Sequence, residues 1–187
     1  MTAPYRGHDD RLLDALDNLE RHAFDGSVWR VVRQGRAAFD GSRGSGRWNP
    51  SDLSVLYTSM TADGALSEIH FHISRSQPVF PSRIRHDLCE ISTKTEQTLI
   101  LANMDELTAL GVKQENYQQL LYHRTQEIAA AAAFLGFDGI IAPSARHTCQ
   151  NLVLFLDTYN LENAEVVSRQ AVDWADWRRK NIKPDSN

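Results

Sequence analysis

The chain has 187 residues, a net charge of −4, 42% hydrophobic residues and 24% charged residues. This length suits one domain with a substantial core, and the composition is ordinary for a soluble globular protein. An acidic chain has no general attraction for nucleic acids or anionic membranes, so we expect neither as a partner. Several arginines still gather in one stretch, which favours a small anionic ligand, with a solvated surface as the alternative: Arg30, Arg33, Arg36, Arg43 and Arg47.

The cysteines and the N-terminal segment predict a cytoplasmic protein. Cys89 and Cys149 lie far apart and belong to no CxxC pair, which argues against a disulfide scaffold and a zinc finger. We expect both to be buried as small apolar side chains. The N-terminal segment has no basic stretch followed by an apolar one, so no signal peptide is evident. No apolar run approaches the ~20 residues that cross a bilayer.

The first part of the chain shows apolar patterns typical of helices and strands. Leucines at three- and four-residue spacing indicate a helix, and large or β-branched residues favour strands. A polar, glycine-rich stretch separates two of the strands, and loops of its length are usually functional or disordered. The predicted elements are a helix over 9–23 that Gly26 ends, strands over 28–33 and 54–59, the loop 34–53, and a helix over 62–70 with Thr61 as its N-cap.

The second part of the chain mixes helices and strands without strict alternation. This mixture predicts one α+β domain over residues 1–187, with a mixed or mostly antiparallel sheet core and flanking helices. Residues 1–26 contain the N-terminal helix, and residues 174–187 form a charged tail. The remaining predicted elements are strands over 86–93, 98–102, 139–142, 151–156 and 164–168, a short helix between Asn103 and Gly111, and a longer one over 117–135 that Asn116 caps and Gly136 ends.

Four side chains in the first part of the chain suit a nucleotide such as NAD. The guanidinium groups of Arg30 and Arg47 match phosphate oxygens, with a structural ion pair as the alternative for Arg30. Tyr57 ends a strand, where its ring either stacks on a flat base or forms part of the core. Glu68 either stabilises a developing oxocarbenium ion and binds a sugar hydroxyl, or is an exposed helix residue.

Two further groups of residues are weaker candidates. Ser144 follows an apolar strand without a GxSxG elbow, so we expect it to bind substrate or cap a turn, with Arg146 and His147 on the same rim. His70 and His72 form an H-x-H pair that would share one face of a strand but diverge on a helix. Because no third ligand stands at tight spacing, we predict no metal site.

An ordered set of motifs resembles the RES-domain family, which takes its name from an arginine, a glutamate and a serine. The resemblance covers roughly residues 27–168. The one clear departure is Pro50, Ser51 and Asp52, where the family usually has a glycine. The motifs are Trp29-Arg30, Gly46-Arg47-Trp48-Asn49, Val55-Leu56-Tyr57-Thr58-Ser59, Ala65-Leu66-Ser67-Glu68 with His72, Leu135-Gly136-Phe137-Asp138-Gly139-Ile140-Ile141-Ala142-Pro143-Ser144-Ala145-Arg146, and Asn151-Leu152-Val153-Leu154-Phe155.

The resemblance implies a fold, an activity and a partner. RES proteins are mostly toxins of type II toxin–antitoxin modules, with a fold similar to that of ADP-ribosyltransferases. They deplete NAD by breaking its nicotinamide–ribose bond, and some members are described as transferring ADP-ribose to a protein. NAD is then the substrate, and no cofactor is needed. The antitoxin is a Xre-like helix-turn-helix protein that covers the active site, which implies a larger complex of toxin and antitoxin.

The resemblance also assigns roles to matching residues. Glu68, Arg47 and Tyr57 match catalytic positions, and Arg30 and Ser144 join Arg47 and Tyr57 in substrate binding. The leading hypothesis is therefore a toxin that cleaves NAD by hydrolysis or phosphorolysis. The alternatives are an ADP-ribosyltransferase that modifies a protein, a non-catalytic nucleotide-binding module and, last, a metal hydrolase.

Overall fold

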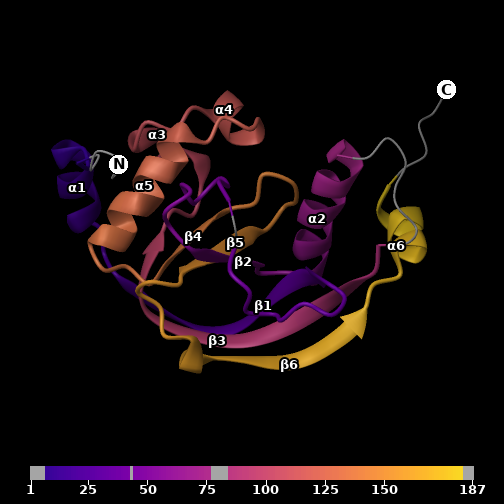
Figure 1. Ribbon diagram of the computed structural model, residues 1–187. Helices are drawn as coiled ribbons and strands as arrows, with labels where there is room; N and C mark the ends of the chain where they lie inside the picture. Colours follow the sequence, from indigo (N-terminus) through magenta and orange to yellow (C-terminus); the bar gives the residue numbers. More distant parts are fainter. Residues whose placement is uncertain (1–6, 43, 77–83, 183–187) are drawn as a thin grey trace, which may run out of the picture.

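The computed structural model describes residues 7–42, 44–76 and 84–182, which leaves out Arg43 of the arginine-rich stretch and the last five residues of the tail. Within these residues, helices flank a six-stranded mixed sheet, and the α+β prediction is confirmed (Figure 1). The strands are β1 (His22–Arg33), β2 (Val55–Ser59), β3 (His86–Ile100), β4 (Gly139–Pro143), β5 (Gln150–Phe155) and β6 (Ala164–Ala171). The helices are α1 (Asp10–Asp17), α2 (Ala62–Ser76), α3 (Met104–Ala109), α4 (Gln114–Gln118), α5 (His123–Phe134), the 3₁₀ turn η1 (Leu161–Asn163) and α6 (Trp174–Asn181).

The strand pairings form a closed circuit. The order is β1-β2-β5-β4-β3-β6, and β1 also pairs with β3 along most of its length. Among the pairings of the six described strands, only that of β3 with β4 is parallel. β1 and β2 share the single pair Trp29 and Ser59, so these two strands diverge on either side of it. Among the described residues β6 pairs with β3 and lies at an edge of the sheet, which confirms the strand predicted over 164–168.

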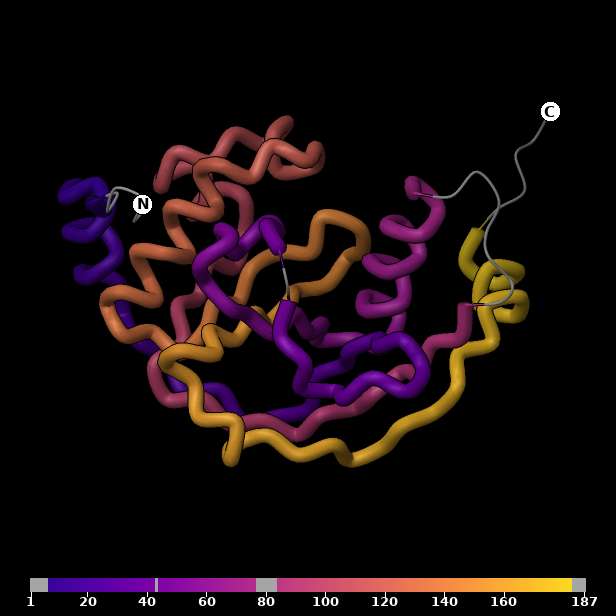
Figure 2. Tube along the Cα trace, viewed as in Figure 1, coloured from indigo at the N-terminus to yellow at the C-terminus, as the bar shows by residue number. Residues whose placement is uncertain are grey.

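Helices gather at two ends of the sheet. At one end, α5 contacts α1 and β4, and the apolar cluster there includes the buried side chains of Trp48, Ile128 and Phe155. At the other end, α2 contacts β1, β2 and β3, and a smaller cluster joins it to Trp174 of α6. Figure 2 shows part of the loop between β1 and β2 rising between α5 and α2. This arrangement brings the loop, α2 and the start of α5 around a common space.

The N-terminal helix is shorter than predicted, because β1 begins at His22. α1 ends at Asp17, and Gly26, which we expected to end it, lies inside β1. The backbone from Phe24 to Arg33 pairs with β3, so long-range hydrogen bonding overrides the helical pattern of the last residues of the predicted helix. Residues 22–26 are therefore part of the sheet and not of an N-terminal helical segment.

One continuous strand, β3, replaces the two strands predicted over 86–93 and 98–102. No strand was predicted between them, but Thr95 is buried there and hydrogen-bonds to the buried Thr98. Asp138 accepts from the Thr98 hydroxyl at 3.1 Å and from the backbone N–H groups of Glu96 and Gln97 at 2.7 and 2.8 Å. These bonds satisfy polar groups that would otherwise favour a solvated loop.

The long helix predicted over 117–135 is two helices, α4 and α5, separated by an extended residue at Gln119. In a continuous helix the carbonyl oxygen of Tyr117 would accept from the N–H of Leu121. Arg47 instead donates to that carbonyl, and the Tyr117 hydroxyl donates to the carbonyl of Pro143 at 2.6 Å. The break thus comes from contacts that are distant in sequence.

The predicted N-caps at Thr61 and Asn103 are confirmed, whereas the one at Asn116 is wrong, because Asn116 lies inside α4. The Thr61 hydroxyl accepts from the N–H of Gly64 at 3.0 Å at the start of α2, which continues beyond its predicted end to Ser76. Asn103 caps α3, and Glu106 accepts from the N–H of Ala102, as in a capping box. Across the described ranges, no helix combines the length and apolar character needed to cross a membrane.

Candidate functional site

A cavity of about 380 Å³ lies among α2, the end of β2, the glycine-rich loop and the start of α5. Four of the five predicted site residues line it: Arg30, Arg47, Tyr57 and Glu68. Ser144, the fifth, supports the cavity from the loop between β4 and β5, because its hydroxyl donates to Glu68 at 2.8 Å. Residues spread over more than 100 positions of sequence therefore meet at one place.

Glu68 is held in the cavity by two donors. One carboxylate oxygen, Oε1, accepts from Ser144 Oγ at 2.8 Å and from Asn151 Nδ2 at 3.4 Å. Ser144 Oγ in turn accepts from the backbone N–H groups of Arg146 and His147 at 3.1 and 3.2 Å. These contacts hold one oxygen and fix the orientation of the carboxylate, which faces a cavity large enough for a sugar ring.

Tyr57 links β2 to the glycine-rich loop through its hydroxyl. That oxygen accepts from the backbone N–H of Trp48 at 2.8 Å and donates to Asn49 Oδ1 at 2.8 Å. Burial raises the pKa of the Tyr57 phenol well above its ordinary value, so the group is neutral at physiological pH. With its hydroxyl engaged by the loop, the side chain is positioned to offer its ring to a ligand.

Gly46 is a glycine that the close packing of this loop around Tyr57 requires. A Cβ placed on it would lie 2.6 Å from the Tyr57 hydroxyl oxygen and 2.7 Å from Asn49 Oδ1, closer than real Cβ contacts. Its carbonyl accepts from Gln126 of α5 at 2.7 Å, so the loop is not free to move away. The glycine content of this segment thus permits close packing against Tyr57.

We expect Gly46→Ala to displace the Tyr57 hydroxyl and to lower the free energy of unfolding by about 1–3 kcal/mol, the usual cost of forcing an extra methyl group into a packed contact. Urea unfolding, measured beside circular dichroism, tests this expectation. Gly7→Ala is the matched control, since a Cβ there meets no described atom within 4 Å. Equal stability of Gly46→Ala and the wild type would show that this contact does not constrain the loop.

Arg47 is enclosed by two tyrosines. Its guanidinium lies 4.5 Å from the ring centre of Tyr117 and 5.0 Å from that of Tyr122, and one of its nitrogens donates to the Tyr117 carbonyl. Such cation–π contacts fix the side chain while leaving its other N–H groups free for a ligand. The carbonyl of Arg47 itself accepts from the Thr125 hydroxyl at 2.6 Å.

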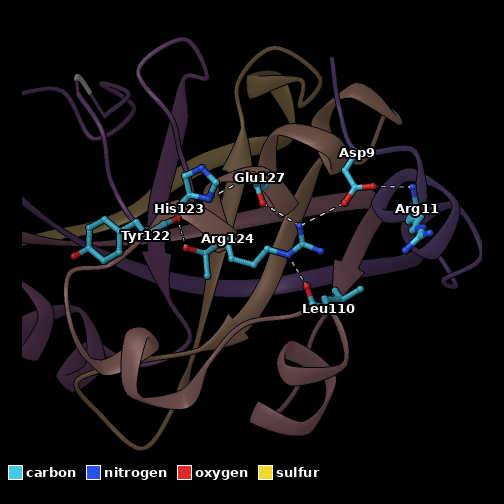
Figure 3. Close-up of polar contacts among 8 residues, drawn as sticks. Asp9, Arg11, Leu110, Tyr122, His123, Arg124 and Glu127 are labelled. Carbon is cyan, nitrogen blue, oxygen red and sulfur yellow. Dashed lines mark hydrogen bonds and ion pairs between the residues drawn. The ribbon is translucent and has the colours of Figure 1, made fainter. Parts of the chain in front are cut away.

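The first turn of α5, which places Tyr122 and Thr125, is anchored by Arg124 (Figure 3). Arg124 donates to the carbonyl of Leu110 at 2.7 Å and to Glu127 at 2.9 Å, and lies 3.9 Å from Asp9 at the start of α1. This group of contacts joins α1, α3 and α5 on the outer side of the helix. It holds the turn that carries one of the two tyrosines around Arg47.

Arg30 lines the cavity, but its guanidinium is already engaged by the backbone. Its two terminal nitrogens donate to the carbonyls of Tyr57 at 3.3 Å and Asp40 at 2.7 Å. The remaining Nε is buried and has no hydrogen-bond partner within the part of the chain that the structure describes. Burial lowers the pKa of Arg30 from its ordinary value. The contacts join β1, β2 and the loop after β1 at the point where β1 and β2 diverge.

Several residues that line the cavity were given no role from the sequence, or were only weaker candidates. Tyr122 and Asn151 line the cavity, and Asn151 lies there because β5 pairs with β2 in a register that places it beside Ser59. Arg146, considered only for the rim, also lines the cavity. The register of the sheet, which a single sequence does not reveal, is what brings Asn151 to Glu68.

The described histidines and cysteines do not come together as one site in the cavity. His72 lines it, whereas His70 packs against Trp177 with ring centres 5.2 Å apart. Nowhere in residues 7–42, 44–76 and 84–182 do three His, Cys, Asp or Glu side chains gather as a metal site would require. Cys89 is buried as predicted, but the prediction for Cys149 is wrong, since it is half-buried with its sulfur 3.4 Å from Ser59 Oγ.

Comparison with known proteins agrees with this fold. No curated protein sequence matches the chain. A chain from the crystal structure of the M. tuberculosis MbcT–MbcA toxin–antitoxin complex has the same fold, with a TM-score of 0.80 at 17% sequence identity, over 91% of this chain and 97% of that one. The model of the RES domain matches residues 27–175. Because this match covers well over half of the sequence, the chain belongs to the RES-domain family.

Proposed function

We propose that this chain is a toxin that depletes cytoplasmic NAD by cleaving the bond between nicotinamide and ribose. The observation that carries the proposal is the fixed carboxylate of Glu68 in a cavity that it shares with Arg47 and the ring of Tyr57. These three groups match the three parts of the substrate that such a reaction must handle: a ribose, a diphosphate and a flat cationic ring.

In the proposed reaction, the bond between ribose C1′ and the nicotinamide nitrogen breaks, and its electron pair goes to that nitrogen. The pyridinium thereby becomes neutral nicotinamide, and positive charge develops on the ribose as an oxocarbenium ion. The Glu68 carboxylate stabilises that charge and accepts a hydrogen bond from a ribose hydroxyl through an oxygen that Ser144 does not occupy. Water or phosphate then adds to C1′ and loses a proton.

The neighbouring residues have supporting roles in this proposal. The ring of Tyr57 stacks on the nicotinamide, and Arg47 binds the diphosphate. Ser144 positions Glu68, since its hydroxyl donates to the carboxylate while two backbone N–H groups hold the hydroxyl oxygen. Because a fixed carboxylate does not have to reorient as charge develops, its stabilising effect is larger than that of a mobile one.

The proposed role as a toxin rests on family membership and on the fold shared with a chain of a toxin–antitoxin complex. We propose a Xre-like helix-turn-helix protein as the antitoxin, bound over the cavity in a larger complex. A partner that covers the cavity would exclude NAD and so keep the toxin inactive.

Purified protein mixed with NAD labelled in its adenylate part tests the reaction. The proposal predicts stoichiometric free nicotinamide together with labelled ADP-ribose, or labelled ADP-ribose 1″-phosphate when phosphate is present. A labelled protein band with little free ADP-ribose would indicate transfer to a protein instead. Binding of NAD without nicotinamide release would contradict catalysis and favour a nucleotide-binding module.

A further inference from the structure

We infer that Arg146 pairs with Arg47 to form the subsite for the phosphate groups of the nucleotide, and that Arg30 is a structural residue. The inference rests on the proposed function for the identity of the nucleotide, but its central claim is narrower. It assigns diphosphate binding to a side chain in the loop between β4 and β5, far in sequence from the arginine-rich stretch.

Arg30 is held by the backbone through both ends of its guanidinium. Each terminal nitrogen donates one of its two N–H groups to a backbone carbonyl, those of Tyr57 and Asp40, which leaves three of the five N–H groups outside these bonds. Its Nε is buried from solvent. A phosphate that drew this guanidinium into the cavity would weaken the carbonyl contacts that join the diverging strands β1 and β2 to the following loop. Arg30 therefore holds the wall of the cavity in shape.

Arg146 differs from Arg30 in what holds its guanidinium, which is an aromatic ring and not backbone carbonyls. Its guanidinium lies 3.5 Å from the ring centre of Phe71 on α2, and it lines the cavity. Among the residues that the structure describes, no hydrogen bond or ion pair engages this guanidinium. Stacking on an aromatic face leaves the N–H groups at the edge of the guanidinium plane available, which is the geometry that binds phosphate oxygens.

The backbone of Arg146 is also held in place, by a hydrogen bond to Ser144. Its N–H donates to Ser144 Oγ at 3.1 Å, and that hydroxyl donates to Glu68. The same short loop therefore sets the position of the carboxylate and of the cation. A nucleotide whose ribose contacts Glu68 would have its phosphate groups within the same cavity, beside this loop.

The charges around the cavity favour an anion at this position. Arg47 and Arg146 line the same cavity, and after burial the charge of Arg47 is the next cause that lowers the pKa of Arg146. The mutual repulsion of two fixed guanidinium groups is relieved when a diphosphate lies between them. Glu68 offsets this repulsion only in part, since its charge raises the pKa of Arg146 less than the charge of Arg47 lowers it.

Titration calorimetry with ADP-ribose and with inorganic pyrophosphate tests the inference without requiring turnover. Arg146→Gln is expected to weaken binding of both probes about 10- to 100-fold, the size expected for loss of a charged hydrogen-bonding group. Arg146→Lys, which keeps the charge but loses the planar fork, is expected to fall between Arg146→Gln and the wild type. Binding of nicotinamide riboside, which has no phosphate, is expected to stay within about twofold in both variants.

Arg75→Gln is the matched control, because Arg75 is exposed on α2 and does not line the cavity. Equal affinity of wild type and Arg146→Gln for ADP-ribose would overturn the inference, as would a folded Arg30→Gln variant that loses affinity instead. If the wild type binds ADP-ribose and Arg146→Gln does not, while neither releases nicotinamide from NAD, the subsite stands and the proposed reaction fails. If Arg146→Gln cleaves NAD with an unchanged KM, the subsite fails and the reaction stands.

Discussion

Glu68→Gln is expected to lower the rate of nicotinamide release from NAD at least about 100-fold, the usual effect of removing one preorganised electrostatic group. Glutamine keeps the size of the side chain and an oxygen that accepts from Ser144 Oγ, so the fold and the hydrogen bond at 2.8 Å are retained. What the variant loses is the negative charge that stabilises the developing oxocarbenium ion in the proposed reaction. The loss is expected in kcat, with little change in KM, because the charge acts on the transition state.

Glu115→Gln provides the matched control, since Glu115 is exposed on α4 and does not line the cavity. Its turnover is expected to equal that of the wild type. Circular dichroism and thermal unfolding of both variants establish that they are folded. Nicotinamide release by folded Glu68→Gln at the wild-type rate would remove the proposed role of the carboxylate.

Phe155→Ala is expected to lower the free energy of unfolding by about 3–5 kcal/mol, the usual effect of truncating a fully buried phenylalanine. Phe155 has 0% of its surface exposed and belongs to the cluster that includes Trp48, whose backbone N–H donates to Tyr57. It ends β5, where it pairs with Val55 of β2. The substitution leaves a cavity beneath the strands that carry Tyr57 and Asn151.

Urea unfolding of wild type, Phe155→Ala and Phe134→Ala measures this effect. Phe134 is the matched control because 60% of its surface is exposed at the end of α5, and its truncation is expected to cost less than about 1 kcal/mol. Similar losses of stability in the two variants would contradict the packing described here. A Phe155→Ala variant too unstable to purify, beside a stable Phe134→Ala, would agree with the expected order.

Local chemistry allowed part of the fold to be predicted from the sequence. The caps at Thr61 and Asn103 depend on side-chain oxygens next to their own helices, so they were predicted correctly. The short apolar strands β2, β4 and β5 were found because their apolar residues form short runs between polar or glycine-containing segments. The α+β class followed from the order of these elements.

Contacts distant in sequence explain the errors. The middle of β3 is a strand because Asp138 satisfies its polar groups, and no local pattern near Thr95 reveals that partner. The break between α4 and α5 comes from Arg47, about 70 positions earlier, which takes the carbonyl of Tyr117. In both cases tertiary hydrogen bonds override the local preference.

The candidate site was predictable where its residues lie within motifs. Arg47, Tyr57 and Glu68 belong to ordered motifs in the first half of the chain, and the structure places all three around one cavity. Their catalytic roles remain predictions. Asn151 was part of a motif but was given no role in the site, and Tyr122 belongs to no motif; sheet register and the first turn of α5 bring them to the cavity. Arg30 was expected in phosphate binding from its residue type, and this role stays a prediction; the fold adds two backbone carbonyls as partners of its guanidinium, which a single sequence does not reveal.

The most direct test of the account is the concentration of NAD in cells after induced expression of the chain, compared with expression of Glu68→Gln at the same level. We predict that NAD falls before growth stops in cells that express the wild type, and that NAD and growth are both maintained with Glu68→Gln. Growth arrest by the wild type with unchanged NAD, or an equal loss of NAD with Glu68→Gln, would contradict the account.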